Sequence, residues 1–331
     1  ITHERDEHLL RQQDALARES GWDEAVVCFM DQPTEPWPQP PARVRTIHLD
    51  GPDLNLAAAR NTAARVARCE VLVCLDVDCL PAPGAVTELA AQCRPGRVVM
   101  ADPHYLPPGW EPPTDPVRAA QPHPRRADLP RGRSDQWHMF WSLGFAMRAD
   151  DFWTVGGFDE AFRGYGGEDT DFAFRCRDAS LELWLSRARV LHQAHAVHRP
   201  PLQHLSSIVV NAHRFHDRWG TWPMEGWLAQ FAEAGLLAET DGGLLVVPMA
   251  ERLTAATAAR LAAALDTGRV GAAWDGSPAR IGLLLLDEAH AGLDRASAGL
   301  VEVVVDLGPP VAGQGRHRAV VSSQCRGSIS A

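Results

Sequence analysis

Three short stretches of this 331-residue chain bring together residue types that can do chemistry. In the first, Asp76 and Asp78 end the apolar run EVLVCLDVD at residues 70–78. Residues i and i+2 of a strand point the same way, and ligands of open α/β sheets bind at the carboxyl ends of strands. Adjacent carboxylates repel unless a cation neutralises them, and a hard divalent ion also bridges to phosphate oxygens. The pair therefore favours a metal and phosphate site over a plain polar turn.

The second stretch is VLHQAHAVH, which places His192, His195 and His198 after an apolar strand-like run. An imidazole from this group could complete the coordination of Mn²⁺ or a similar ion that Asp78 begins. A polar loop that is merely rich in histidine is the alternative, and the histidines alone leave both interpretations open.

The third stretch is GYGGEDTDFAFR, residues 164–175, in which three glycines precede Glu168, Asp169 and Asp171. The acids fall in the first turn of an expected helix, where free amides and the helix dipole stabilise anions. This is compatible with simple capping, and Asp171 is interpreted as a plain first-turn acid. The same effect should lower a carboxyl pKa and keep it ionised, as a base accepting a hydroxyl proton must be.

The elements around these stretches must bring them to one place. Apolar runs at residues 24–30, 44–49 and 70–78 predict buried strands, and helical spacing at 6–20 and 55–67 predicts helices between them. This alternation predicts right-handed crossovers and an α/β fold with a mixed, mostly parallel sheet flanked by helices.

The second half of the pattern continues with expected strands at 96–101 and 139–148 and expected helices at 168–179 and 206–220. Residues 106–136 are crowded with Pro, Arg and Asp and are too long for an ordinary connection. Long segments of this kind are often functional lids, so we expect one that excludes water from a reaction.

Composition excludes several function classes. The net charge is −10, so a nucleic-acid partner, which needs a basic surface, is not expected. All 32 basic residues are arginine, which rules out Schiff-base chemistry, pyridoxal phosphate attachment and a phosphate-loop lysine. The seven cysteines are odd in number and show no C-x-x-C pair, as expected for reduced, buried thiols in the cytoplasm.

We expect three regions along the chain. A catalytic domain should cover residues 1–232, with its first strand truncated ahead of Ile1, and a small α/β appendix should cover 233–312. Residues 313–331 are expected to be disordered. No apolar run approaches the roughly 20 residues of a membrane span, and no signal peptide is visible. We therefore expect a cytoplasmic protein, at most peripheral at the inner face of the membrane.

The order D-x-D, G-x-G-G-E-D, histidine resembles the GT-A fold glycosyltransferases, specifically family 2 members with a galactosyltransferase-like C-terminal half. GGFDEAFRGYGGEDTDFAFR (156–175) is similar to a signature that lines the acceptor and donor-sugar site. THERDEHLL (2–10) and AAARN (57–61) resemble further family segments, and NAHRFHDRWGTWPMEGW (211–227) is reminiscent of actinobacterial members. The resemblance covers roughly residues 1–230 and implies the GT-A fold.

The resemblance implies a role for each matching residue. Asp78 would bind the metal, Mn²⁺ or Mg²⁺, together with His192 or His195, of which we favour His192. Asp169 would be the catalytic base, and Glu168 would hold the acceptor or orient the base. The expected substrate-binding residues are Arg5, Arg60, Asp76, Trp141, Gly144, Tyr165, Gly166 and Gly167. Tyr165 replaces a family tryptophan, so the donor-sugar preference should differ.

The implied reaction is an inverting transfer of a hexose or N-acetylhexosamine from a UDP-sugar to a hydroxyl of a glycan, lipid-linked or small-molecule acceptor. Two alternatives come from other classes. A nucleotidyltransferase would carry a glycine-rich loop near the first strand, but this chain has THERDEH there. A non-catalytic nucleotide-sugar-binding domain would not need its acids and histidine intact.

Overall fold

The computed structural model describes residues 5–30, 43–49, 54–195, 200–240, 243–246, 280–285, 301–306 and 320–324. The chain forms two compact units, Ile1–Val197 and His198–Ala331. This division lies ahead of residue 232, where the sequence places the end of the catalytic domain. His198 of the expected histidine cluster lies outside the described residues.

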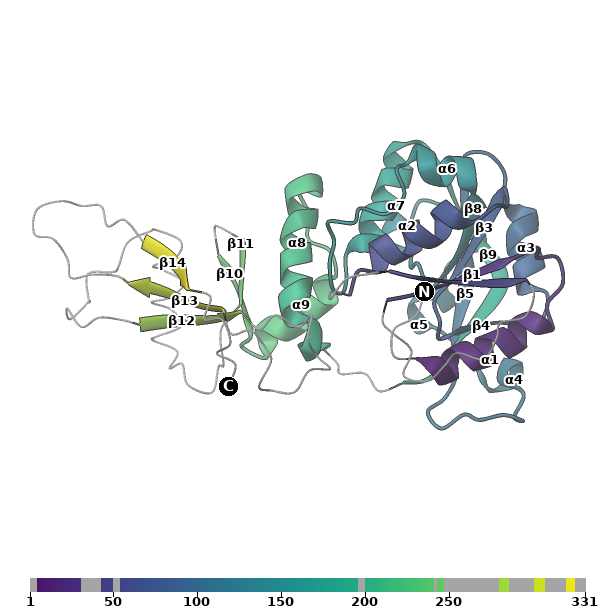
Figure 1. Ribbon diagram of the computed structural model, residues 1–331, viewed down its shortest axis with the longest axis horizontal. Coiled ribbons are helices and arrows are strands. Elements are labelled where there is room, and N and C mark those ends of the chain that lie inside the picture. Colours follow the sequence, from purple (N-terminus) through teal and green to yellow (C-terminus); the bar gives the residue numbers. More distant parts are fainter. Residues whose placement is uncertain are drawn as a thin grey trace, which may run out of the picture. The chain divides into compact units, whose positions relative to one another are not determined.

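The first unit is built on a mixed sheet (Figure 1). Its order is β3 (Val71–Leu75), β8 (Gly144–Arg148), β5 (Arg97–Tyr105), β9 (Glu182–His192) and β4 (Cys79–Pro81). Strands β3, β5 and β9 run one way and β8 and β4 the other, so the ends of β3, β5 and β9 meet at one edge. A separate parallel pair consists of β1 (Ala25–Phe29) and β2 (Val44–His48).

Helices accompany these strands, and three of them lie at the predicted positions 6–20, 55–67 and 168–179. The helices are α1 (Asp6–Ala17), α2 (Leu56–Val66), α3 (Ala85–Gln92), α6 (Ala149–Thr154) and α7 (Glu168–Asp178). The core of the sheet contains a cluster of phenylalanine rings, Phe140, Phe145, Phe152, Phe158 and Phe172, all at most 2% exposed. The expected mixed α/β fold is confirmed.

The stretch from Glu182 to His192 forms one long strand, β9, because it pairs along most of its length with β5. One prediction of local structure differs from the observed element. The run at 139–148 becomes a strand only from Gly144, because a 3₁₀ turn, η1 (Trp137–Met139), precedes it.

The segment 106–136 is largely ordered into short elements rather than an open loop. It contains α4 (Pro116–Ala119), β6 (Gln121–Pro122), α5 (Pro124–Ala127) and β7 (Gly132–Ser134). Strand β6 pairs with β5 and β7 pairs with β9, so non-local strand pairing fixes the second half of the segment. The side chain of Arg126 is fully buried and donates to the carbonyl of Ala101.

The second unit contains α8 (Leu205–Trp219) and α9 (Glu225–Glu233), followed by a hairpin of β10 (Leu237–Thr240) and β11 (Gly243–Val246). Helix α8 buries Ile208, Ala212 and Phe215, as its spacing predicts. Strands β12 (Arg280–Leu285), β13 (Val301–Asp306) and β14 (Val320–Gln324) form an antiparallel sheet, and β14 falls in the stretch expected to be disordered.

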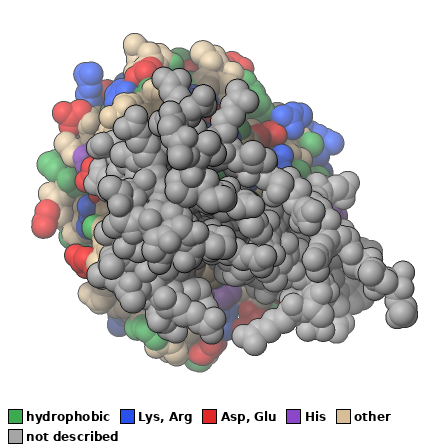
Figure 2. Space-filling model, turned by 90° about the vertical axis from the view of Figure 1, so that its left-hand side faces the viewer, with side chains coloured by type: hydrophobic (Ala, Val, Ile, Leu, Met, Phe, Trp, Pro, Cys, Tyr) green, Lys and Arg blue, Asp and Glu red, His purple; other side chains and the backbone are tan. Residues whose placement is uncertain are grey.

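Surface and membrane properties can be judged for the described residues alone. Among them, no helix combines the length and apolar character needed to cross a membrane. Where described side chains are visible in Figure 2, acidic and basic groups lie interspersed and form no continuous basic surface there.

Candidate active site

The D-x-D stretch lies in a tight turn at the end of β3. The Cys79 amide donates to the Asp76 carbonyl at 2.9 Å, which closes the turn, and β4 begins at once. The Asp78 carbonyl accepts from the Gln193 amide at 2.7 Å, so the turn is joined to the end of β9. Because the backbone turns here, the two carboxylates have different partners: Asp76 pairs with Arg60, whereas Asp78 lies beside Arg5 and two histidines.

Asp78 faces two histidines at the end of β9: His192, the last residue of the strand, and His195 just after it. Its Oδ1 lies 3.7 Å from His192 Nε2 and its Oδ2 lies 3.5 Å from His195 Nε2. One ligand atom from each of the three residues lies within 4.8 Å of the others. The structure thus brings together Asp78 and both candidate histidines, His192, which the sequence analysis favours, and His195.

The strand pairing explains why His192 arrives at this point. It is the last residue of β9, opposite Cys79 of β4 on one side and Tyr105 of β5 on the other. Its ring stacks on Tyr105 with centroids 4.7 Å apart. Its Nδ1 is buried and has no hydrogen-bond partner within the described part of the chain. Tyr105 is a site residue that the sequence analysis missed.

Helix α1 brings two further side chains to Asp78. Arg5, at the N-cap, has Nη1 3.5 Å from Asp78 Oδ2, close to the expected phosphate position. His8 has its ring centroid 6.3 Å from that of His195. Burial, together with the positive charge of Arg5, lowers the pKa of His8 and favours its neutral form. His8 belongs to the family-like segment THERDEHLL, but its residue type and spacing alone predict no role for it.

Arg60 of α2 joins the two halves of the site. Its Nη2 lies 3.0 Å from Asp76 Oδ1 and its Nη1 lies 3.1 Å from Glu168 Oε1. The residue is only 6% exposed. Burial alone would lower its pKa, but the Asp76 and Glu168 carboxylates raise it above the ordinary value. Both terminal nitrogens of Arg60 are thus engaged by protein carboxylates at the position where the resemblance implies nucleotide contact.

Helix α7 begins at Glu168, directly after Gly167, whose φ of 88° suits glycine. The Asp169 Oδ1 accepts from the Thr170 amide at 2.7 Å. Burial, followed by the negative charge of Glu168, raises the pKa of Asp169 to about 7. The expectation of a lowered pKa from the helix dipole is therefore wrong, because desolvation and a like charge outweigh it.

Tyr165 lies among the acids of both halves. Burial raises the pKa of its hydroxyl, and Glu168, Asp169, Asp76 and Asp78 raise it further. All four expected carboxylates are thus close enough to act on one side chain. The position expected to set donor-sugar preference therefore lies within the electrostatic field of all four acids.

The backbone conformation of the third stretch requires glycine at two further positions. Gly164 and Gly166 have φ of 70° and 91°, a region that other residues rarely adopt. The Gly164 amide donates to the Leu54 carbonyl at 2.7 Å, which ties the stretch to the start of α2. Asn61 of the same helix, which the sequence analysis left without a role, bonds the amide and carbonyl of Phe158.

The structure also shows where three further residues of the sequence analysis lie. Trp141 is half-buried and packs edge-on against His123, with ring centroids 4.7 Å apart. Gly144 is buried in the sheet, where an added Cβ would lie 3.1 Å from side-chain carbons of Ala101 and Val190. Asp171 is fully buried and accepts from Arg175 Nε at 2.9 Å, so it is an internal ion-pair partner rather than a plain first-turn acid.

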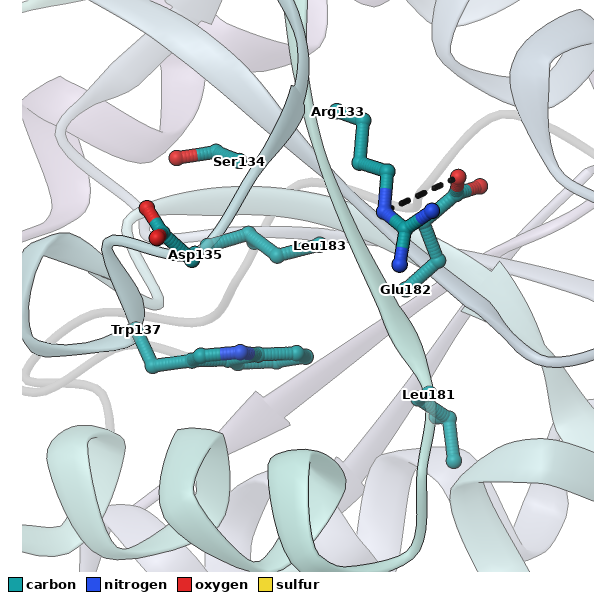
Figure 3. A pocket seen from close by; sticks show the side chains of 7 residues that line it. All are labelled: Arg133, Ser134, Asp135, Trp137, Leu181, Glu182 and Leu183. Atoms are coloured by element: carbon teal, nitrogen blue, oxygen red, sulfur yellow. Dashed lines mark ion pairs between the residues drawn. The ribbon is translucent and has the colours of Figure 1, made fainter.

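A separate hollow of about 490 Å³ lies beside the first residues of β9 (Figure 3). It is lined by Arg133, Ser134, Asp135, Trp137, Leu181, Glu182 and Leu183. None of the candidate site residues lines it, and His192 is at the opposite end of β9. This hollow is therefore not part of the candidate active site.

The amino-acid sequence matches two families. Glycosyl transferase family 2 matches residues 31–156, and the N-terminal domain of galactosyltransferase matches residues 127–208. Together the matches run from residue 31 to residue 208, which is more than half of the chain. They include the D-x-D turn, the start of α7 and both histidines.

Two curated relatives are validoxylamine A glucosyltransferases of Streptomyces hygroscopicus. The protein of subspecies jinggangensis (strain 5008) is 31% identical over 198 residues, which cover 52% of this chain and 47% of that protein. The protein of subspecies limoneus is 30% identical over 198 residues, with 52% and 44% covered. This chain thus spans about half the length of the curated relatives it matches.

Solved structures show more distant likenesses. GalNAc-T7 with UDP, GalNAc and Mn²⁺ has a TM-score of 0.48 and 14% identity, covering 68% of this chain and 54% of that one. The mannosyltransferase PcManGT of Pyrobaculum calidifontis, in complex with GDP-Man and Mn²⁺, has a TM-score of 0.44 and 15% identity, covering 81% and 78%.

Proposed function

Because this chain belongs to glycosyltransferase family 2, we propose that it transfers a hexose or N-acetylhexosamine from a UDP-sugar to an acceptor hydroxyl with inversion at the anomeric carbon. The observation that carries the proposal is the convergence of Asp78, His192 and His195 within 4.8 Å. Asp76, in the same turn as Asp78, is joined through Arg60 to Glu168 at the start of α7. The relatives are named glucosyltransferases, so UDP-glucose is the first donor to test.

The residues present fit a divalent cation. One carboxylate and two imidazoles form a mixed donor set, which suits Mn²⁺ better than Mg²⁺, because Mg²⁺ prefers oxygen ligands. The Nδ1 of His192 has no hydrogen-bond partner among the described residues, so a flip of the ring would break no hydrogen bond at this atom. Either ring nitrogen could therefore bind the ion. We propose that Asp78, His192 and His195 hold the ion. When bound, it would neutralise the charge of the departing diphosphate.

We propose that Asp169 is the general base. Its carboxylate accepts the acceptor hydroxyl proton while the oxygen bonds to the anomeric carbon and the bond from that carbon to UDP breaks. A raised pKa near the working pH suits this task, because the base is still ionised yet takes up a proton readily. Glu168 beside it is held by Arg60, and this pair fixes the start of α7.

Arg5 is proposed to contact the donor diphosphate, because its guanidinium already lies beside Asp78 and about a quarter of the side chain is exposed. Arg60 is proposed to position carboxylates rather than to touch the nucleotide. Asp76 is the more exposed of the two partners of Arg60, so it is proposed to face the substrate. Tyr165 and Trp141 are proposed to line the sugar site.

The test measures UDP release with Mn²⁺ from UDP-glucose, UDP-galactose and UDP-N-acetylglucosamine, with validoxylamine A as the first acceptor and water as the background. Asp169→Asn should still bind UDP but lose transfer by a factor on the order of 10² or more. Asp178→Asn, at an exposed acid of the same helix, is the matched control and should transfer normally. Equal turnover of the two variants would refute the base assignment.

A further inference from the structure

We propose that Gln12 of α1 is a positioning residue for the metal site, because its carboxamide fixes the main chain on both sides of Asp78. This inference rests on the proposed function, since it assumes that Asp78 binds a cation. Gln12 itself touches neither substrate nor metal in this proposal.

The contacts of Gln12 are short and buried. Its Nε2 lies 2.7 Å from the Asp76 carbonyl oxygen and 2.7 Å from the Cys79 carbonyl oxygen, and the residue is 7% exposed. A carboxamide nitrogen carries two hydrogens, so it can donate to both oxygens at once. Only Val77 and Asp78 stand between the two carbonyls, and the amide therefore spans the turn that carries the metal ligand.

The same helix is also bonded to the segment that carries the histidines. Gln193 Nε2 donates to the His8 carbonyl at 3.1 Å, while the Gln193 amide donates to the Asp78 carbonyl at 2.7 Å. Gln193 directly follows His192 and is 1% exposed. Helix α1 thus holds the Asp78 turn through Gln12 and the end of β9 through Gln193.

This arrangement has a consequence for metal binding. Asp78 and His192 come from a turn and a strand end far apart in the sequence, and the distances between their ligand atoms depend on how these segments are held. Without the Gln12 donor, the Asp76 carbonyl keeps the Cys79 amide, but the Cys79 carbonyl loses its Gln12 bond. The turn can then relax, and the ligand atoms no longer converge as closely.

Gln12→Glu is the most informative substitution because charge and geometry predict opposite results. A carboxylate keeps the shape of the side chain but puts acceptor oxygens against two carbonyl oxygens. An added negative charge near Asp78 would by itself strengthen cation binding. Loss of positioning should instead weaken Mn²⁺ binding by about tenfold or more, the usual range for groups that orient metal ligands.

The control is Gln13→Glu, which makes the same chemical change one position later on α1. Gln13 Nε2 has no hydrogen-bond partner among the described residues, so the turn does not depend on it. Gln12→Asn is the second test variant, since it keeps an uncharged amide but shortens its reach by one methylene. Each variant of the 331-residue chain is titrated with Mn²⁺ at a temperature below its melting temperature. The concentration of free Mn²⁺ is measured by electron paramagnetic resonance.

We expect weaker Mn²⁺ binding in Gln12→Glu and Gln12→Asn and unchanged binding in Gln13→Glu. If the unaltered chain binds Mn²⁺ and a folded Gln12 variant binds it equally well, the positioning role is overturned while the metal site stands. If the unaltered chain fails to bind Mn²⁺, the metal site falls and this inference falls with it.

Discussion

The Arg60 guanidinium donates from Nη1 to Glu168 Oε1 at 3.1 Å, although the two residues are 108 positions apart in the chain. Its other terminal nitrogen bonds Asp76 of the D-x-D turn at 3.0 Å. One buried side chain therefore couples the turn that carries the proposed metal ligand to the helix that carries the proposed base.

Arg60→Met should destabilise the protein by about 3–5 kcal/mol, because it leaves Glu168 buried and unpaired while Asp76 loses its partner. Urea unfolding gives this free energy. Adding Glu168→Gln to Arg60→Met should recover part of the loss, since the uncompensated buried charge is then gone. Arg65→Met is the control on the same helix. Its side chain is 60% exposed, so the change should stay within about 0.5 kcal/mol.

The pH profile of transfer should follow Asp169. Because burial and Glu168 raise its pKa to about 7, kcat/KM should rise as the pH increases through that region, where the base loses its proton. Arg60 lowers the pKa of Asp169, so Arg60→Met should move the rising limb to higher pH. A rising limb near the ordinary carboxyl pKa, in both proteins, would contradict the assignment.

The same pKa predicts a stability effect of defined sign. Between the ordinary carboxyl pKa and about 7, the folded state holds a proton on Asp169 that the unfolded state has lost. Stability should therefore fall as the pH rises through this window. Asp169→Asn carries no such proton, so the free energy of unfolding of this variant, relative to the unaltered chain, should increase from pH 4 to pH 7 and then level off.

The local patterns of the sequence predicted much of the site, because strand ends and helix starts are encoded by neighbouring residues. The acid-ended apolar run and the glycines before Glu168 identify Asp78 and Asp169 in this way. The Asp171–Arg175 pair could also have been found, since its i, i+4 spacing is local. Its complete burial could not, because that depends on the packing of distant elements.

The partners of these residues could not be predicted, because they come from distant parts of the chain. Gln12 and Gln13 are neighbours of the same type, and only the tertiary structure places the first within 2.7 Å of the D-x-D turn. The short strands β6 and β7 likewise form because they pair with β5 and β9. These partners are not encoded locally, so the Pro- and Arg-rich pattern of the segment predicts a loop.

The segment 106–136 is expected to keep water from the reaction. We propose that its first half, ahead of the paired strands β6 and β7, has this role. Arg11 of α1 donates to both carboxylate oxygens of Glu111, at 3.1 and 2.9 Å, and this pair joins the segment to α1.

Glu111→Ala removes this pair and should raise the ratio of UDP-sugar hydrolysis to transfer. The free energy of unfolding should change by less than about 1 kcal/mol, because the pair is exposed. Glu7→Ala, which removes the other acidic partner of Arg11, is the control, and an equal ratio in both would contradict the lid.

The two tyrosines of the chain, Tyr105 and Tyr165, offer a direct test of the metal site. Tyr105 stacks on His192 at 4.7 Å, and Tyr165 lies within the field of Asp78. A chain labelled with 3-fluorotyrosine should give two ¹⁹F signals, assigned with Tyr105→Phe. Mn²⁺ bound by Asp78 and the histidines should broaden both, because its unpaired electrons relax nearby nuclei, whereas diamagnetic Mg²⁺ should not broaden them in this way.

Asp78→Asn separates binding at this site from binding elsewhere. The substitution keeps the shape of the side chain but removes the charge that attracts the cation, so the broadening by Mn²⁺ should disappear at the same ion concentration. Asp14→Asn, at an exposed acid of α1, should leave the broadening intact. A sharp Tyr105 signal in the unaltered chain with Mn²⁺ present would exclude an ion at Asp78, His192 and His195, since the Tyr105 ring stacks on the ring of His192.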